Sequence, residues 1–156
     1  MLQLTVYRKA YNWRHATQKA TIELLEDTHN QFHSVMQLRY VNSEHQDSVW
    51  TLQDVHELLE YWAKRRAFEK RPNVACLHVE HKEMSLSSNN YLVVPVVEIS
   101  GTVDPVEPDL VKQTLVEFFT FLLLELHQPT VQVHYTFQGL PQPSLTLNNK
   151  QHILYK

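Results

Sequence analysis

The segment from residue 90 to residue 137 constrains the fold more than any other part of the chain. A strand-like apolar run over 91–103 is followed by a turn, by a helix over 108–127 that is apolar on almost every side, and by an alternating strand over 131–137. One side of such a helix can cover a sheet, but the remaining apolar surface needs a second partner. The segment therefore predicts an α+β fold in which this helix packs on a sheet and on something else.

The second partner can come from the chain itself or from another copy of it. The polar stripe of the helix, formed by Gln113, Glu117 and Thr120, is narrow. The first alternative is that the other helix or the tail covers the apolar remainder within the monomer. The second alternative is self-association, because exposed apolar patches of this size mark interfaces. We favour the second, and expect a homodimer or a homotetramer with the isologous contacts usual for two-fold assemblies.

Alternation of apolar and polar residues predicts strands elsewhere in the chain. They are expected over residues 2–7, around residues 22–24, over 32–40 and over 74–82. Pro95 interrupts the strand over 91–103, and proline lacks a donor for the ladder. We therefore expect an edge position or a bulge at Pro95.

A second helix is predicted from Thr51 to about Lys70. Thr51 is suited to the N-cap and Asp54 to the first turn, and apolar residues then recur at helical spacing until Pro72. With 156 residues, the chain is expected to form one domain over 1–138, followed by a C-terminal tail over 139–156.

Composition excludes several classes of function. The chain has two glycines, Gly101 and Gly139, and phosphate-binding loops need several close together. Neither a P-loop nor a dinucleotide fingerprint is present. A single cysteine, Cys76, cannot form an internal disulfide, and the N-terminus does not resemble a signal peptide. We expect a cytoplasmic protein without membrane insertion, since no apolar run reaches the roughly 20 residues needed to cross a bilayer.

No catalytic or metal-binding motif stands out among the ten histidines. In His78-Val-Glu-His81, residues 78 and 80 share one face of a strand, whereas residue 81 points the other way. The two histidines therefore cannot bind one ion, and we predict no metal. Glu98 and Asp104 flank a bend without any sign that they face each other as an acid/base pair. The expectation is a protein that is not an enzyme and uses no cofactor.

The order of elements in the second half resembles the SecB-like fold of protein-export chaperones, and the small uncharacterised SecB-like proteins of Gram-positive bacteria most. The matching segments are Glu98–Val103, Pro108–His127 and Pro129–His134. The resemblance implies an antiparallel sheet of about four strands packed by the long helix of the C-terminal half. It also implies a cytoplasmic oligomer that binds unfolded polypeptide, with the helix near 51–70 as an insertion.

On this interpretation an apolar groove captures extended polypeptide. The residues expected to line it, or the subunit interface, come from the long strand and the long helix: Tyr91, Val93, Val97, Phe118, Phe119, Phe121 and Leu122.

The alternative is a regulator that binds nucleic acid through the basic helix over 51–71. Its cations are Lys64, Arg65, Arg66, Lys70 and Arg71. The net charge of −3 argues against nucleic acid as the main partner.

Overall fold

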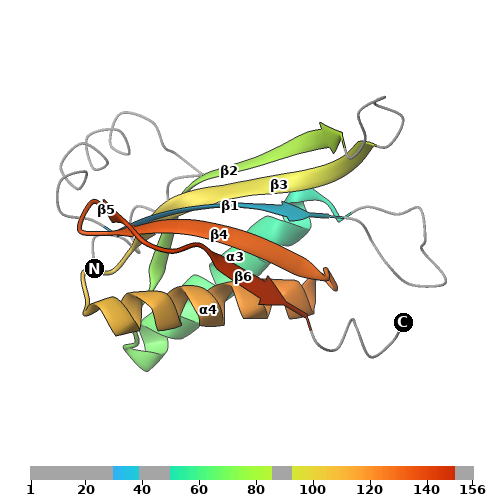
Figure 1. The fold of residues 1–156 in the computed structure, drawn as a ribbon. Coiled ribbons are helices and arrows are strands. Elements are labelled where there is room, and N and C mark those ends of the chain that lie inside the picture. Colours follow the sequence, from blue (N-terminus) through green and yellow to red (C-terminus); the bar gives the residue numbers. More distant parts are fainter. Residues whose placement is uncertain (1–29, 39–49, 86–92, 150–156) are drawn as a thin grey trace, which may run out of the picture.

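The computed structural model describes residues 30–38, 50–85 and 93–149. In this part of the chain, six antiparallel strands form one sheet, and two helices cover one of its faces (Figure 1). The predicted α+β class with an antiparallel sheet is confirmed, although six strands are present where about four were expected. The strands predicted over 2–7 and around 22–24 lie outside the described residues.

The elements keep the labels of Figure 1. They follow the chain in the order β1 (Asn30–Gln37), α3 (Leu52–Glu69), β2 (Val74–Ser85), β3 (Val93–Val103), α4 (Pro108–Glu125), β4 (Thr130–Phe137), β5 (Leu140–Pro141) and β6 (Leu145–Asn148). The strand order in the sheet is β2-β3-β1-β4-β5, and β6 pairs with β4. The segment after Gly139 therefore adds two short strands to the sheet.

Helix α3 begins where the sequence predicts it. The backbone N–H of Asp54 donates to the Thr51 hydroxyl at 3.1 Å, and the N–H of Thr51 donates to the Asp54 carboxylate at 2.9 Å. This capping box satisfies two donors that a helix start leaves free. Lys70 ends the helix in the left-handed conformation. The buried side of α3 belongs to the main core, so the helix is one of the layers of the fold and not an appended insertion.

Helix α4 packs against the sheet and against α3. Phe118 and Phe119 are fully buried, and their rings lie 6.2 and 5.7 Å from the ring of Phe32 in β1. On the α3 side, Phe121 stacks on Tyr61 with the ring centroids 5.9 Å apart. The first alternative, cover from within the chain, therefore accounts for most of the apolar surface of this helix, while Leu110 in its first turn is 37% exposed. Among the described residues, neither helix combines the length and apolarity that crossing a lipid bilayer requires.

Pro95 occupies an interior strand, contrary to the expected edge position. β3 lies between β2 and β1, and the pairing with β1 ends at Val96 opposite Gln37. Just beyond that pair, the N–H of Leu38 donates to the Pro95 carbonyl at 2.9 Å. The Leu38 carbonyl accepts from Trp50 N–H at 2.8 Å. The N–H of Trp50 thus occupies the Leu38 carbonyl in place of the N–H that Pro95 lacks. The β2–β3 ladder continues through this position, and the β1–β3 ladder reaches the neighbouring pair, without a bulge.

The irregularity lies instead in β2, between Cys76 and His78, opposite Gly101 of β3. A Cβ atom at Gly101 would lie 1.9 Å from the Ala75 carbonyl oxygen. Glycine at this position therefore permits the close approach of the two backbones that accompanies the bulge.

The two glycines of the chain give a matched test of this close approach. We expect Gly101→Ala to lower the free energy of unfolding by about 3 kcal/mol, because the methyl group overlaps the β2 backbone. Gly139→Ala should cost about 1 kcal/mol, because Gly139 has a φ of 83° but open space around its Cβ position. Urea unfolding of both variants measures the difference, and equal losses would contradict the steric explanation.

Candidate functional site

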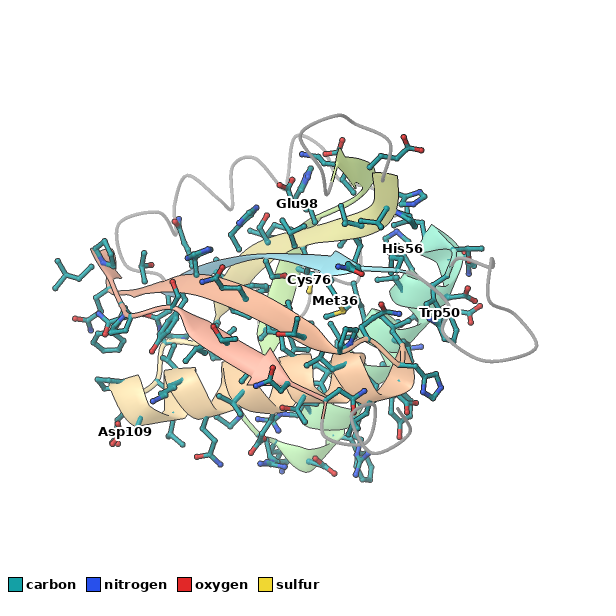
Figure 2. All side chains as sticks on the ribbon, turned by 45° about the vertical axis from the view of Figure 1, so that its right-hand side comes forward. Met36, Trp50, His56, Cys76, Glu98 and Asp109 are labelled. Carbon is teal, nitrogen blue, oxygen red and sulfur yellow. The ribbon has the colours of Figure 1, made fainter. Side chains whose placement is uncertain are left out.

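Helices α3 and α4 pack on one face of the sheet, and the opposite face carries a polar cluster. Along β3, Val97 and Ile99 point into the core, whereas Glu98 between them lies on the opposite face (Figure 2). Glu98 is paired with Val35 of β1 on one side and with Glu80 of β2 on the other. Its side chain therefore receives neighbours from two strands.

We define the Glu98 cluster as Glu98, His33, His78, Glu80 and Lys82. The His33 Nε2 atom lies 2.9 Å from Glu98 Oε2. The His78 Nε2 and Lys82 Nζ atoms each lie 3.1 Å from Glu98 Oε1. The Glu98 side chain is 19% exposed, while the other four are about half exposed. Both oxygens of the central carboxylate are thus engaged at a place that small molecules can reach.

The second carboxylate gives the cluster a surplus of negative charge. Glu80 Oε2 lies 3.0 Å from His78 Nε2 and 3.8 Å from Lys82 Nζ. Two carboxylates face one ammonium group, so the cluster carries a net charge of about −1 while both imidazoles are neutral. Such an arrangement complements a ligand that brings one positive charge.

Hydrogen bonding keeps the central carboxylate ionised. The hydrogen bond from His33, followed by that from Lys82, lowers the pKa of Glu98 from 4.5 to about 2. The hydrogen bond to Glu98 in turn raises the pKa of Lys82. An ionised carboxylate can only accept, so the Nε2 atoms of His33 and His78 carry the donated protons. In the neutral imidazoles this leaves each Nδ1 as the basic nitrogen.

Three ligand atoms of the cluster could also hold a metal ion. One atom each from His78, Glu80 and Glu98 lies within 4.8 Å of the others. The Lys82 ammonium already contacts Glu98 there. The strand alternation that places residues 78 and 80 on one face is confirmed, and the absence of a bound metal stays a prediction.

Sequence reasoning singled out His78 and Glu80 but missed their partners. The register of β1, β2 and β3 brings His33, Lys82 and Glu98 to them, and a single sequence does not reveal which residues of separate strands lie opposite each other. Asp104, by contrast, has a structural role, since its carboxylate accepts from the backbone N–H of Asn73 at 2.9 Å.

A hollow of about 550 Å³ lies at the start of α4. Its amide groups already serve the fold: Asn30 Nδ2 donates to the Asp104 carbonyl, and the Gln138 backbone N–H donates to Asn30 Oδ1. Fewer polar groups converge there than at the Glu98 cluster, so we regard the cluster as the better candidate. Residues from three segments form its walls: Asn30, Pro105, Val106, Glu107, Pro108, Leu110, Phe137 and Gln138.

The residues predicted to line an apolar groove do not form one in the described structure. Val97, Phe118, Phe119 and Leu122 are fully buried in the core. Phe121 is partly buried between α4 and α3. Tyr91 and the side chain of Val93 lie outside the described residues. These positions are apolar in the sequence, but the buried ones form the hydrophobic core and not a groove.

The predicted basic patch is largely an ion-pair network. Arg66 is 4% exposed and lies 2.6 Å from Glu117 of α4, and Arg71 lies 2.9 Å from the same carboxylate. On the surface of α3, Lys64 pairs with Glu60 and Arg65 with Glu69. Lys70 provides the helix cap. Four of the five cations therefore lie beside carboxylates, and nucleic-acid binding through this helix stays a prediction.

Comparison with known proteins gives two similar solved structures. One is a phage SAM lyase in complex with S-methyl-5'-thioadenosine, with a TM-score of 0.55 and 11% sequence identity. The other is a phage SAM lyase in the apo state, with a TM-score of 0.55 and 13% identity. Each match covers 78% of this chain and 90% of the lyase chain. No protein-family profile matches the chain, and no curated protein matches it in sequence.

These structures correct the predicted family. The SecB-like resemblance is wrong, because the solved structures that share this fold are those of a phage SAM lyase. The expectations of a polypeptide-binding chaperone and of a protein that is not an enzyme fall with it. The resemblance rested on the spacing of apolar positions in a strand–helix–strand segment. That spacing is common to α+β folds of this kind and does not report the order of strands in the sheet.

The ion pairs of Arg66 predict a difference in stability between two neighbouring arginines. Arg66→Met should lower the free energy of unfolding by about 2 kcal/mol, because Glu117 and the Pro72 carbonyl each lose a donor in a partly buried setting. Arg65→Met should leave it nearly unchanged, because its pair with Glu69 is exposed and screened by water. Chemical unfolding of both variants checks this, and a larger effect at Arg65 would contradict it.

Glu98 predicts a pH-dependent contribution to stability. Its pKa is lowered in the folded chain, so the stabilisation is present above the unfolded value of 4.5 and is lost as the pH falls through about 2. We expect Glu98→Gln to lower Tm at pH 7, with the gap to wild type closing as the pH falls from 4.5 to 2. The exposed Glu125 on α4 provides the control, Glu125→Gln. A gap that is the same at every pH would contradict the charge-based explanation.

Proposed function

We propose that the chain binds an adenosyl sulfonium compound, with S-adenosylmethionine as the first candidate, at the Glu98 cluster. We further propose that it cleaves this compound as a lyase and releases S-methyl-5'-thioadenosine. The observation that carries the proposal is the fold shared with the SAM lyase over 90% of that protein.

The charge of the Glu98 cluster supports this ligand. S-adenosylmethionine carries a sulfonium and an ammonium group against one carboxylate, so its net charge is about +1 when its amine is protonated. The cluster offers about −1 on an exposed face, with Glu98 ionised at neutral pH. The cationic ligand and the negatively charged cluster therefore attract each other. Because the carboxylates are partly exposed, binding removes only part of their water.

The lyase reaction makes modest chemical demands on the protein. The bond between the sulfonium sulfur and the γ-carbon of the methionine part breaks, and its electron pair stays on sulfur. The leaving thioether is therefore neutral and needs no proton. The four-carbon fragment either loses a proton to a base or closes on its own carboxylate. The Nδ1 atoms of His33 and His78 are the candidate bases in the cluster, because their Nε2 protons are held by Glu98.

Charge alone cannot supply the rate enhancement in this scheme. The positive charge on sulfur falls as the bond breaks, so carboxylates near the sulfonium stabilise the bound substrate more than the transition state. We therefore assign Glu98 to substrate binding and to orientation of the imidazoles. Acceleration then depends on how the substrate is held for proton loss or ring closure.

Self-association, which the sequence predicts, stays a separate proposal. The phenylalanines of α4 do not require it, because Phe119 packs on Phe32 of β1 and Phe121 on Tyr61 of α3. The test of function is therefore designed for whatever assembly the full chain forms in solution.

The first experiment combines binding and turnover on the purified full chain. Calorimetry with S-adenosylmethionine measures binding, and mass spectrometry of the reaction detects S-methyl-5'-thioadenosine. We expect wild type to bind and to release the product, and Glu98→Gln to bind S-adenosylmethionine at least about tenfold more weakly. Glu125→Gln, an exposed carboxylate on α4, should match wild type.

The outcomes separate the two parts of the proposal. Binding without product would support the proposed ligand and contradict the proposed lyase reaction. An absence of both binding and product at millimolar ligand would overturn the proposed function. Equal weakening by Glu98→Gln and Glu125→Gln would remove the cluster as the site.

A further inference from the structure

We infer that Lys82 is an exchangeable counter-ion of the Glu98 cluster, which weakens the binding of a cationic ligand and favours release of a neutral one. This inference rests on the proposed function and concerns how the same site distinguishes a sulfonium compound from the thioether that forms from it.

The position of the Lys82 ammonium group carries the argument. Its Nζ atom lies 3.1 Å from Glu98 Oε1 and 3.8 Å from Glu80 Oε2, so it contacts both carboxylates of the cluster. In this structure the ammonium group is the one fully charged cation within salt-bridge distance of either carboxylate among the described residues. A ligand cation drawn to the two carboxylates would be drawn to the place that Lys82 holds.

The exposure of Lys82 makes the exchange feasible. Its side chain is 45% exposed, and an ion pair between exposed side chains contributes little to stability, because water screens it. A lysine side chain is flexible, and its ammonium group can move into water while the aliphatic part stays on the sheet. The free energy needed to move the ammonium group aside is therefore small. Only a cationic ligand has to supply it, because a neutral ligand does not compete with Lys82 for the carboxylates.

The histidines hold the rest of the site in place during such an exchange. The His33 Nε2 atom lies 2.9 Å from Glu98 Oε2, on the oxygen that Lys82 does not contact. The His78 Nε2 atom bridges Glu80 at 3.0 Å and Glu98 at 3.1 Å. Both carboxylates therefore keep a hydrogen-bond donor when the ammonium group leaves. The site loses a charge but not its geometry.

The neutral product reverses the competition. After the carbon–sulfur bond has broken, the thioether has no charge to hold Lys82 away from the carboxylates. Return of the ammonium group then restores the ion pairs without any repulsion from the bound product. Lys82 thus raises the dissociation constant of the sulfonium substrate and leaves that of the thioether nearly unchanged.

The test compares two ligands across three variants. Kd is measured by calorimetry for S-adenosylmethionine and for S-methyl-5'-thioadenosine with wild type, Lys82→Met and Lys82→Arg. Lys64→Met is the matched control, because Lys64 also pairs with a glutamate at 2.6 Å but on the surface of α3. Thermal unfolding of each variant confirms that it is folded.

We expect Lys82→Met to bind S-adenosylmethionine about fivefold more tightly and the thioether within about twofold of wild type. Lys82→Arg should restore values close to wild type, and Lys64→Met should change neither. Raising the salt concentration should narrow the gap between Lys82→Met and wild type, because the repulsion acts between exposed charges.

Three results would overturn the inference. Weaker binding of S-adenosylmethionine by Lys82→Met would mean that Lys82 contacts the ligand's carboxylate. Equal changes for both ligands would indicate a structural role, with the proposed function intact. A wild type that binds neither ligand would remove the proposed function itself, and the inference with it.

Discussion

The bulge in β2 is the constraint on which the candidate site depends. Cys76 pairs with Gly101 and His78 pairs with Ser100, so Leu77 is the extra residue. If β2 kept a regular register past Cys76, His78 would lie opposite Ile99 and Glu80 opposite Val97. Both would then face the core, because a shift of one residue exchanges the two faces of a strand. The bulge thus lets β2 place Cys76 in the core and His78 and Glu80 beside Glu98. Gly101 is required because a side chain there would meet the β2 backbone.

Local signals explain why much of the fold could be predicted from the sequence. Thr51 and Asp54 form the capping box that their spacing indicates, and Pro108 opens α4 as its position suggests. The alternation in β1 and β4 reports correctly which residues face the core. Strand order, by contrast, is set by pairing between distant segments. The residues near Pro95 in the sequence do not indicate that β3 is an interior strand. They also do not indicate that Trp50 N–H donates to the Leu38 carbonyl in place of the N–H that Pro95 lacks.

The candidate site was less predictable than the fold for the same physical reason. His78 and Glu80 are two residues apart on one strand, so their common face could be predicted. Their approach to Glu98 depends on the β2–β3 register and on a bulge that one glycine permits. The apolar surface of α4 was also ambiguous, since a neighbouring helix and a second subunit would bury the same residues. Tyr61 and Phe32, which contact this helix from α3 and β1, show that cover from within the chain accounts for it.

Among the described residues, charge networks surround Glu117 and Glu98, and the difference between the two supports the proposal that a ligand binds at Glu98. Around Glu117, Arg66 and Arg71 place two cations on one carboxylate, with Arg66 buried and held also by the Pro72 carbonyl. That network joins α3 to α4 and fits a structural role. Around Glu98, two carboxylates share one exposed ammonium group on the face away from the helices. A network of that kind can exchange its cation without unfolding any element, because its carboxylates stand on strands whose other face belongs to the core. The exposed Lys82 ion pairs lie on strands whose other face is packed in the core, and this arrangement supports the proposal that a ligand binds at Glu98.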